Sequence, residues 1–314
     1  MGENIKFETK PKTRYLVSRS CIGNPSRKVK IDVRADGQFI LGNSLNESGE
    51  YAINTIYGDV AVSHTGGNLS SGVTYDVDVA YRVMGDVTAA MNGGKINAGI
   101  IGYEDASGST TKGGTLTVTG ASMVSVTSFI GKSMSLQSSG PVTLIGNARA
   151  FGTGGNDRGS LTVGGVNGTA PDINFQSNLS GGTITLTGRN ISGTGSYGDV
   201  NSGATFVDFA DICTINASGA IGINEGFKGG ALTVTGGGNV VLDLLGIPEG
   251  ASLASAKITS KNKGISMRAF TGGTLSATAQ ESLTISRDVK ASGNVELKGA
   301  SVGIGRSLTS SAGN

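Results

Sequence analysis

A short phrase that recurs along the chain constrains its fold more than any other feature of the sequence. The phrase consists of two small residues, an arbitrary residue, and then alternating apolar and hydroxyl-bearing residues. Clear copies are Gly113–Thr119, Gly181–Thr187, Gly229–Thr235 and Gly272–Thr278, and shorter or fainter copies are Gly66–Ser70, Gly93–Asn97 and Gly159–Val163. The distances between copies fit one or several units of roughly 20–27 residues, and self-similarity at such a period is typical of a solenoid.

A second phrase predicts another strand of the same unit. A Gly and one arbitrary residue precede β-branched residues or Leu at every second position, as in Gly140–Leu144, Gly219–Ile223, Gly238–Leu242 and Gly293–Leu297. Alternation with a period of two is typical of a strand buried on one face. Gly and Asn at the ends of these segments tolerate the left-handed backbone that tight corners need. Many of the 53 glycines in this 314-residue chain are therefore interpreted as corner residues.

The chain is predicted to be all-β. A short strand with one apolar face cannot bury that face alone, whereas coiling the chain stacks each strand on its equivalent about 4.8 Å away. We expect a single-stranded parallel β-helix, or β-solenoid, over residues 51–314, with about 20–27 residues per coil. Residues 1–50 are more charged and less rich in Gly. We expect them to form an N-terminal cap or an assembly arm that couples to another subunit, because the end strands of a solenoid are exposed edges.

A β-sandwich or barrel of Gly-linked strands is the alternative fold. It would favour two-residue Asn-Gly hairpin turns, and the sequence contains only Asn92-Gly93 and Asn167-Gly168. Collagen is excluded because Gly does not occur at every third position and there are only 5 Pro. Hydrophobic residues make up 37% of the chain and occur in short ordered runs, which is not typical of a disordered chain.

The two phrases together resemble the haemagglutination-activity repeats of filamentous-haemagglutinin-type adhesins. The resemblance covers roughly residues 110–310 and is greatest from Gly272 to Ile304. Inward positions in that segment are Leu275, Leu283, Ile285, Val289, Val295, Leu297, Val302 and Ile304. The resemblance implies a right-handed β-helix used for surface display or adhesion. The secretion domain of that family carries Asn-Pro signatures, and this sequence has only Asn24-Pro25 in the corresponding region.

Charge is unevenly distributed along the chain, although the formal net charge is only +2. Residues 1–30 carry a net charge of +6, residues 31–250 carry −9, and residues 251–314 carry +5. The candidate assembly residues are the basic side chains of the first segment: Lys6, Lys10, Lys12, Arg14, Arg19, Arg27, Lys28 and Lys30. We expect them to contact the acidic middle of a neighbouring copy or to be solvated. A nucleic-acid partner is not expected, because Phe7 and Tyr15 are too few aromatic residues for a base-stacking platform.

No catalytic residue, cofactor or metal site is predicted. The only His, His64, is expected at the surface or at a corner, and together with the distant Cys21 and Cys213 it suggests no zinc site. The spacing of the two Cys leaves open whether they are bonded. Gly154–Asp157 is similar to one copy of a calcium-binding nonapeptide repeat, but such a site needs successive copies. An ordinary turn is expected there.

Two pairs of carboxylates keep a polysaccharide-cleaving enzyme as a further alternative. Asp76 and Asp78 would share one face of a strand, and Asp208 and Asp211 would share a face only across a bend. The expected role of the first pair is a charged outer face that protects a strand edge. One His, no Trp and 5% aromatic residues offer little for catalysis or sugar stacking, so the chain is expected not to be an enzyme.

The expected function is that of a structural subunit that self-assembles into, or decorates, an extracellular fibre or surface layer. The polar segment Ser307–Asn314 shows no cap, which suggests stacking on a second copy. The alternative is an adhesin or phage receptor-binding protein that recognises a glycan or a host protein. Residues 1–30 contain no apolar run typical of a secretory signal, and no window approaches 18 consecutive apolar residues. We expect no membrane span and an extracellular or cell-surface location, reached through a removed leader or another route.

Overall fold

β-Strands joined by turns make up the structure, a computed structural model that describes residues 3–10, 14–17, 21–42, 55–65, 75–104, 110–152, 158–194, 206–224, 226–246 and 253–311. These residues contain no helix, which confirms the predicted all-β class. The chain divides into two compact units. The first consists of Met1–Gly159 with Gly165–Thr169, and the second of Ser160–Gly164 with Ala170–Asn314.

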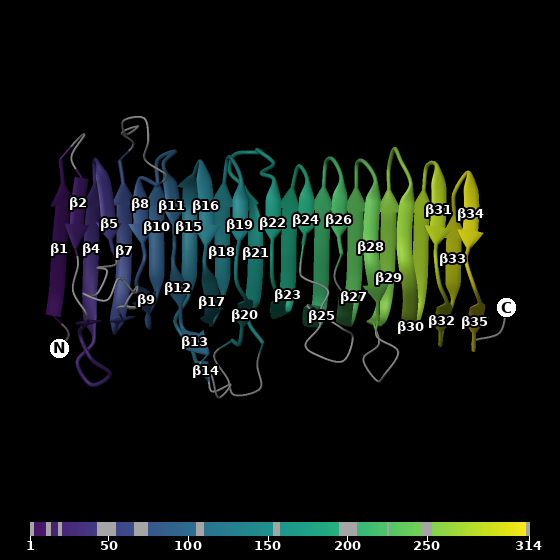
Figure 1. Ribbon diagram of the computed structural model, residues 1–314, viewed down its shortest axis with the longest axis horizontal. Helices are drawn as coiled ribbons and strands as arrows, with labels where there is room; N and C mark the ends of the chain where they lie inside the picture. The colour runs from purple at the N-terminus through teal and green to yellow at the C-terminus, as the bar shows by residue number, and fades with distance from the viewer. Residues whose placement is uncertain are drawn as a thin grey trace, which may run out of the picture. The chain divides into compact units, whose positions relative to one another are not determined.

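The first unit is built from three ladders of parallel strands, named here A, B and C (Figure 1). Ladder A contains β1 (Glu3–Thr9), β4 (Val29–Ala35), β7 (Gly58–His64), β10 (Val87–Met91), β15 (Leu116–Ala121) and β18 (Met134–Ser138). Ladder B contains β2 (Arg14–Val17), β5 (Gln38–Leu41), β8 (Val77–Val79), β11 (Lys95–Asn97), β16 (Met123–Val126) and β19 (Val142–Leu144). Ladder C contains β3 (Cys21–Ile22), β6 (Thr55–Ile56), β9 (Arg82–Val83), β12 (Ile100–Ile101), β17 (Ser128–Gly131) and β20 (Ala148–Ala150). The chain passes through A, B and C and then returns to A, so that each pass forms one coil.

Strands of successive coils pair in register, and the separation between partners measures the length of a coil. Leu116 pairs with Met134, 18 residues later, whereas Val87 pairs with Leu116, 29 residues later. The shortest coils are therefore shorter than the expected 20–27 residues. Longer separations arise where a loop is inserted between two strands, and such insertions do not disturb the pairing of the strands themselves.

The core of the first unit consists of apolar side chains stacked coil upon coil. Pairing in ladder A places Ile31, Val60, Val87, Leu116 and Met134 in one column. All five side chains are buried. Burying one side chain of this kind contributes about 1.5–3 kcal/mol to the free energy of unfolding. No single strand could bury these residues alone, but stacked coils bury all of them. The residues between these positions point outward because successive side chains of a strand alternate between its two faces.

The expected boundary at residue 50 has no counterpart in the strand pairing. β1 pairs with β4, and β4 pairs with β7, along their whole lengths. β5 likewise pairs with β8. The described part of residues 1–50 therefore belongs to the first two coils of the first unit. The segment Val29–Ala35 buries every second residue like the later strands, and its many charges lie on the outer face.

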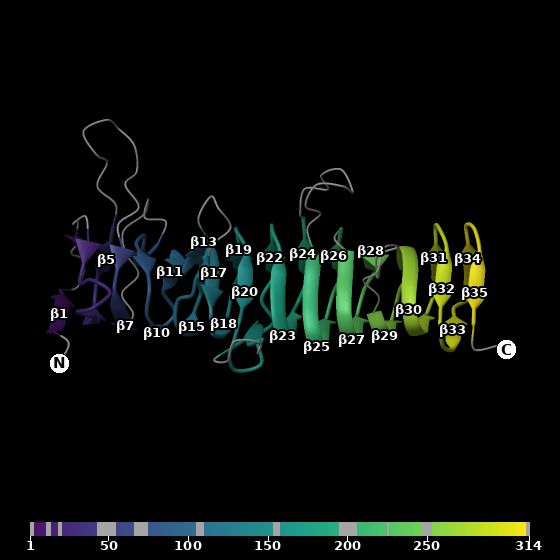
Figure 2. The same cartoon turned by 90° about the horizontal axis from the view of Figure 1, so that it is seen from below.

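The second unit has the same three-ladder topology, with ladders named here D, E and F. Ladder D contains β21 (Ser160–Gly165), β23 (Leu179–Gly188), β25 (Phe206–Ala217), β27 (Gly226–Gly236), β29 (Leu253–Ser260), β30 (Ile265–Ala279) and β33 (Val295–Lys298). Ladder E contains β22 (Ile173–Phe175), β24 (Ile191–Gly193), β26 (Ile221–Ile223), β28 (Val240–Leu245), part of β30, β31 (Ser282–Ile285) and β34 (Ser301–Ile304). Ladder F contains the first parts of β23, β25 and β27, the end of β28, the middle of β30, β32 (Val289–Ala291) and β35 (Leu308–Ser310). Figure 2 shows β23, β25 and β27 side by side.

The long strands of the second unit bend as they pass from ladder F to ladder D. In the pairing of β25 with β27, the register shifts between Phe209 and Ile212. Gly229 lies at this bend with a φ of +133°, and a Cβ at this position would lie 1.7 Å from the carbonyl oxygen of Phe209. Only glycine fits here, because any side chain would collide with the neighbouring coil.

Parallel pairing does not fit the alternative of strands linked by Asn-Gly hairpins. Among the described residues, antiparallel pairing is confined to β13 (Tyr103–Glu104) with β14 (Thr110–Thr111) and to an isolated bridge between Asn24 and Arg27. Hairpins would pair consecutive strands antiparallel, whereas here a strand pairs with its equivalent in the next coil. The long parallel ladders of each unit are consistent with a β-solenoid.

Candidate functional site

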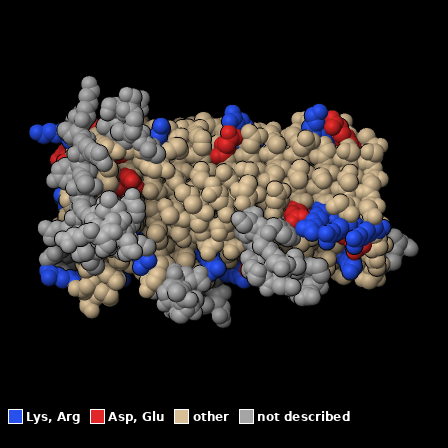
Figure 3. Space-filling view, in the orientation of Figure 1, with Lys and Arg blue, Asp and Glu red and all other residues tan. Residues whose placement is uncertain are grey.

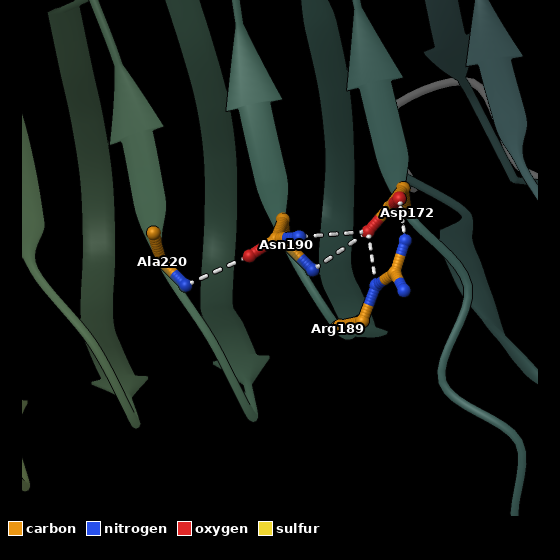
Figure 4. A network of polar contacts seen from close by, with 4 residues as sticks. All are labelled: Asp172, Arg189, Asn190 and Ala220. Carbon is orange, nitrogen blue, oxygen red and sulfur yellow. Dashed lines mark hydrogen bonds and ion pairs between the residues drawn. The ribbon is translucent and has the colours of Figure 1, made fainter.

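Polar side chains join successive coils at the corner that precedes ladder E. Asp172, Asn190 and Ala220 come directly before β22, β24 and β26, and thus occupy the same corner in three coils (Figure 4). Arg189 donates through Nε to Oδ1 of Asp172 at 3.0 Å and through Nη2 to Oδ2. Nδ2 of Asn190 donates to Oδ1 of Asp172 at 3.0 Å, and Oδ1 of Asn190 accepts from the backbone nitrogen of Ala220 at 3.0 Å. Hydrogen bonding to Arg189 lowers the pKa of the Asp172 carboxyl below its usual value.

Carboxylates also bind the backbone of the next coil in the first unit, where strands of ladder A begin. Oδ1 of Asp59 accepts from the backbone nitrogen of Asp86 at 2.9 Å. Oδ1 of Asp86 in turn accepts from the backbone nitrogen of Thr115 at 2.7 Å. Part of the negative charge in the middle of the sequence is therefore used to hold neighbouring coils together.

The first predicted carboxylate pair is also bound to the next coil. Oδ2 of Asp76 accepts from the backbone nitrogen of Lys95 at 2.7 Å, and Asp76 is buried. Oδ1 of Asp78 accepts from Nδ2 of Asn97 at 2.9 Å. Burial raises the pKa of the Asp78 carboxyl, partly opposed by the hydrogen bond from Asn97. Both carboxylates thus tie the β8 coil to the β11 coil.

The second pair considered, Asp208 and Asp211, lies in β25, with Asp208 before the register shift between Phe209 and Ile212 and Asp211 within it. Asp208 forms an ion pair with Lys228 of the next coil, with Oδ2 and Nζ 3.3 Å apart. Asp211 is exposed. The bend that would let Asp208 and Asp211 share a face is present in β25. Asp208 is nevertheless bound to Lys228 of the next coil.

His64 is buried rather than at the surface, with only 3% of its surface exposed. It is the last residue of β7, between Ala35 and Met91 of the neighbouring coils. Neither ring nitrogen has a hydrogen-bond partner among the described residues. Desolvation by burial lowers the pKa of the imidazole, and the negative charges of Asp76 and Asp36 oppose this effect only in part. The alternation of Val60, Val62 and His64 along β7 is the signal in the sequence that could have placed this side chain inward.

The two Cys and the segment Gly154–Asp157, for which no metal site is expected, can be placed only in part. Cys213 is a free, fully buried thiol in β25, and desolvation raises its pKa well above the ordinary range. The side chain of Cys21 and the segment Gly154–Asp157 lie outside the described residues. Within the described part of the chain, no three His, Cys, Asp or Glu side chains lie close enough to hold a metal ion.

Two of the predicted assembly residues that the structure describes, Lys6 and Lys30, lie beside acidic side chains. Lys12 and Arg19 lie outside the described residues, and of Arg14 only the backbone is described. Lys6, Lys10, Arg27, Lys28 and Lys30 are exposed. Lys6 lies beside Asp32 in ladder A, and Lys30 lies beside Asp59 and forms a 3.3 Å ion pair with Asp32. These coils therefore present alternating charges, with Glu8 beside Arg34 completing the pattern.

The coil formed by β33, β34 and β35 has an uncovered apolar edge. Val302 of β34 is 45% exposed, although its partner Leu283 is fully buried. Leu308 of β35 is 52% exposed, although its partner Val289 is fully buried. Among the described residues, β33, β34 and β35 have strand partners on one side only. The edge thus presents unpaired backbone groups together with side chains that every preceding coil buries.

Basic residues gather over the same end of the second unit, where Figure 3 shows a band of Lys and Arg at the lower right. The backbone nitrogen of Arg287 donates to the carbonyl of Arg268 in the preceding coil at 2.8 Å. Arg306 follows Ile304 by two residues as Arg287 follows Ile285, and these two Ile are register partners. The three arginines therefore form a column, named here the arginine column.

Acidic residues border the arginine column, and one of them pairs with Arg268. Nη1 of Arg268 lies 3.5 Å from a carboxylate oxygen of Asp243. Asp288 accepts hydrogen bonds from the hydroxyl and the backbone nitrogen of Ser307. These bonds, together with the charges of Lys290 and Arg306, lower the pKa of the Asp288 carboxyl. Arg287, Lys290 and Arg306 are exposed.

An open groove of about 690 Å³ lies beside Lys290. Hydroxyl-bearing and small residues line it, among them Thr271, Gly272, Ser292, Thr309 and Ser311. Such a lining offers hydrogen-bond donors and acceptors and allows close approach of a ligand to the backbone. Sequence reasoning missed both this groove and the arginine column, because the residues of each are about 19 positions apart and meet only through coiling.

Comparison with known proteins shows no relative: no protein-family model, curated protein or solved structure matches this chain. The described residues include no helix that could cross a membrane. The features that indicate a function are the uncovered edge of β33–β35, the alternating charges of β1 and β4, and the arginine column with its groove.

Proposed function

We propose that this protein is a structural β-solenoid subunit that assembles with copies of itself into an extracellular or cell-surface fibre or layer, or decorates one. The proposal includes the finer description of the fold as a single-stranded parallel β-helix in which residues 1–50 act as a coupling segment. We propose no catalytic role and no cofactor. The mechanism is the addition of strands to strands, in which backbone hydrogen bonds give affinity and side-chain register gives specificity.

The observation that carries the proposal is the uncovered edge of β33–β35. Exposed apolar side chains such as Val302 and Leu308 on an unpaired strand edge favour association, because covering them removes apolar surface from water and pairs free backbone groups. Natural sheet edges are usually blunted by charge, proline or a covering segment. Val302 and Leu308 are instead continuous with the buried columns of the preceding coils.

Sedimentation velocity over a hundredfold range of protein concentration, with electron microscopy of the same samples, tests this function. We expect linear particles whose mass increases with concentration. The double variant Val302→Thr, Leu308→Thr lowers the apolar area of the edge and should shift assembly to higher concentration. Val241→Thr, which changes an exposed Val in the middle of the second unit, is the matched control. Monomers at every concentration would refute the proposal.

The arginine column favours a second candidate function, recognition of an acidic glycan by an adhesin or receptor-binding protein. Arg287 and Arg306 are exposed and lie on successive strands, which are spaced about 4.8 Å apart. Their guanidinium groups present repeated donors to a linear chain of carboxylates. The groove beside Lys290 could take the sugar rings and their hydroxyl groups. Host proteins remain the other partner class of this candidate.

Binding to polygalacturonate, with dextran as an uncharged comparison, tests the second candidate by calorimetry or a pull-down assay. Wild-type protein should bind only the acidic polymer, and less strongly at high salt, because exposed charges are screened. Arg287→Ala with Arg306→Ala should abolish binding, whereas Lys257→Ala with Lys261→Ala, two exposed lysines outside the column, should not. Equal binding by both double variants would exclude the column as the site.

A further inference from the structure

The two outermost strands of ladders A and D have the same alternating pattern. In β1 the half-buried Ile5 and Phe7 alternate with the exposed Lys6 and Glu8. In β33 the half-buried Val295 and Leu297 alternate with the exposed Glu296 and Lys298. Among the described residues, β1 pairs only with β4, and β33 only with β30. Each strand therefore has one free edge and an apolar row that is only half covered.

We propose that β33 of one copy adds in parallel to β1 of a second copy, with Val295 beside Ile5 and Leu297 beside Phe7. This inference rests on the proposed function and names the contact through which assembly proceeds. The register places Glu296 of one copy beside Lys6 of the other. It likewise places Lys298 beside Glu8. β34 and β35 then lie against β2 and β3, so the exposed edge of the coil becomes covered.

The charges select this register over its neighbours. A shift of two residues in one direction would place Glu296 beside Glu8 and Lys298 beside Lys10. A shift of two in the other direction would place Lys298 beside Lys6. Like charges directly opposite each other destabilise a strand pair, whereas opposite charges stabilise it. A shift of one residue would turn the charged row toward the core, because side chains alternate between faces.

Within ladder A, neighbouring strands also place opposite charges beside each other. In ladder A, Lys6 lies beside Asp32, and Glu8 lies beside Arg34. The proposed junction therefore extends two columns in which charge alternates from coil to coil. One column runs from Glu296 through Lys6 to Asp32, and the other continues from Lys298 through Glu8 to the arginine of β4. The ion pair between Glu296 and Lys298 within β33 shows that both side chains already lie on one face.

Cysteine cross-linking of the full chain tests the register. In a Cys21→Ser background, Glu296→Cys with Lys6→Cys brings two thiols to directly paired positions, where Cα atoms about 5 Å apart allow a disulfide. Mild oxidation should yield covalent oligomers that disappear on reduction. Glu296→Cys with Glu8→Cys is the matched control, because its thiols would be offset by two residues. Cross-linking of the control as fast as the test pair would overturn the proposed register.

A charge exchange tests the same contact without a covalent bond. Glu296→Lys with Lys298→Glu keeps the ion pair within β33 but reverses both junction pairs. We expect the protein concentration for half-assembly to increase about tenfold or more. Lys263→Glu with Glu281→Lys exchanges an exposed ion pair elsewhere in the second unit and should leave assembly unchanged. If the wild-type protein assembles and the β33 exchange leaves assembly unchanged, only the proposed junction is refuted. If the wild-type protein never assembles, the proposed function is refuted.

Discussion

Oδ1 of Asn190 accepts a hydrogen bond of 3.0 Å from the backbone nitrogen of Ala220, the residue that occupies the same corner one coil later. The two residues are 30 positions apart, since a long insertion separates their coils. The contact shows how this fold preserves register where coil length varies: a side chain at the corner binds the backbone of the next coil before the strand begins. Asp59 and Asp86 act in the same way in the first unit.

Replacement of Asn190 by Ala should lower the free energy of unfolding by about 1 kcal/mol. The substitution removes the acceptor for Ala220 and a donor to Asp172, and a typical net hydrogen bond contributes 0.5–1.5 kcal/mol. Water partly replaces both partners because the corner is exposed. Urea unfolding of the variant measures the change. Asn294→Ala is the control, because that exposed Asn makes no side-chain hydrogen bond with the described residues, and an equal loss there would contradict a corner role for Asn190.

Replacement of Gly229 by Ala should be severe, with a loss of roughly 2–6 kcal/mol from backbone strain and overpacking together. Its φ of +133° is unfavourable for other residues, and the added Cβ would collide with the carbonyl of Phe209. Gly222→Ala in the adjacent strand β26 is the matched control, because a Cβ there meets no atom within 4 Å. Thermal unfolding monitored by circular dichroism compares the two variants. Similar melting temperatures would show that the bend can relax.

The thiol of Cys213 should be unreactive in the folded protein. Full burial raises its pKa and blocks access, and only the thiolate reacts with disulfide reagents. In a Cys21→Ser variant at pH 8, a chromogenic disulfide such as Ellman's reagent should detect no thiol until urea unfolds the chain, and then one per molecule. Rapid reaction under native conditions would show that β25 opens locally.

Stability should decrease as the pH falls below 6.5, through His64. Burial lowers its pKa in the folded state below the ordinary 6.5, so below that pH the unfolded chain binds more protons than the folded chain. Stability therefore rises with pH between the folded and unfolded pKa values and is fully present above the latter. His64→Leu removes this dependence and should flatten the unfolding free energy between pH 6.5 and about 5, above the range where most carboxylates titrate. An unchanged slope in the variant would assign the dependence to other groups.

The strands could be predicted from the sequence, whereas most contacts between the strands could not. Alternation in Gly113–Thr119 and Gly272–Thr278 predicted strands with one buried face, and the inward residues Leu116 and Leu275 are buried as expected. The charged composition of residues 1–50 favours a cap or an assembly arm, whereas the alternation of Val29–Ala35 favours a strand of a coil. The alternation of Val29–Ala35 predicts the observed strand better than its composition does, because a coil accepts charged side chains on its outer face. Only charged side chains that point inward would be incompatible with a coil.

By itself, the sequence determined that this chain is all-β, with short strands whose apolar residues face one side and with glycine at many corners, since these properties depend on neighbouring residues. Only the tertiary structure decided which residues meet across coils: the 18-residue pairing of Leu116 with Met134, the corner bond from Ala220 to Asn190 and the arginine column. Each such contact depends on the length of the loops between strands. A change in loop length alters which residues pair across coils, but it does not alter the local sequence pattern. The stacking of the coils therefore decides which side chains lie beside one another.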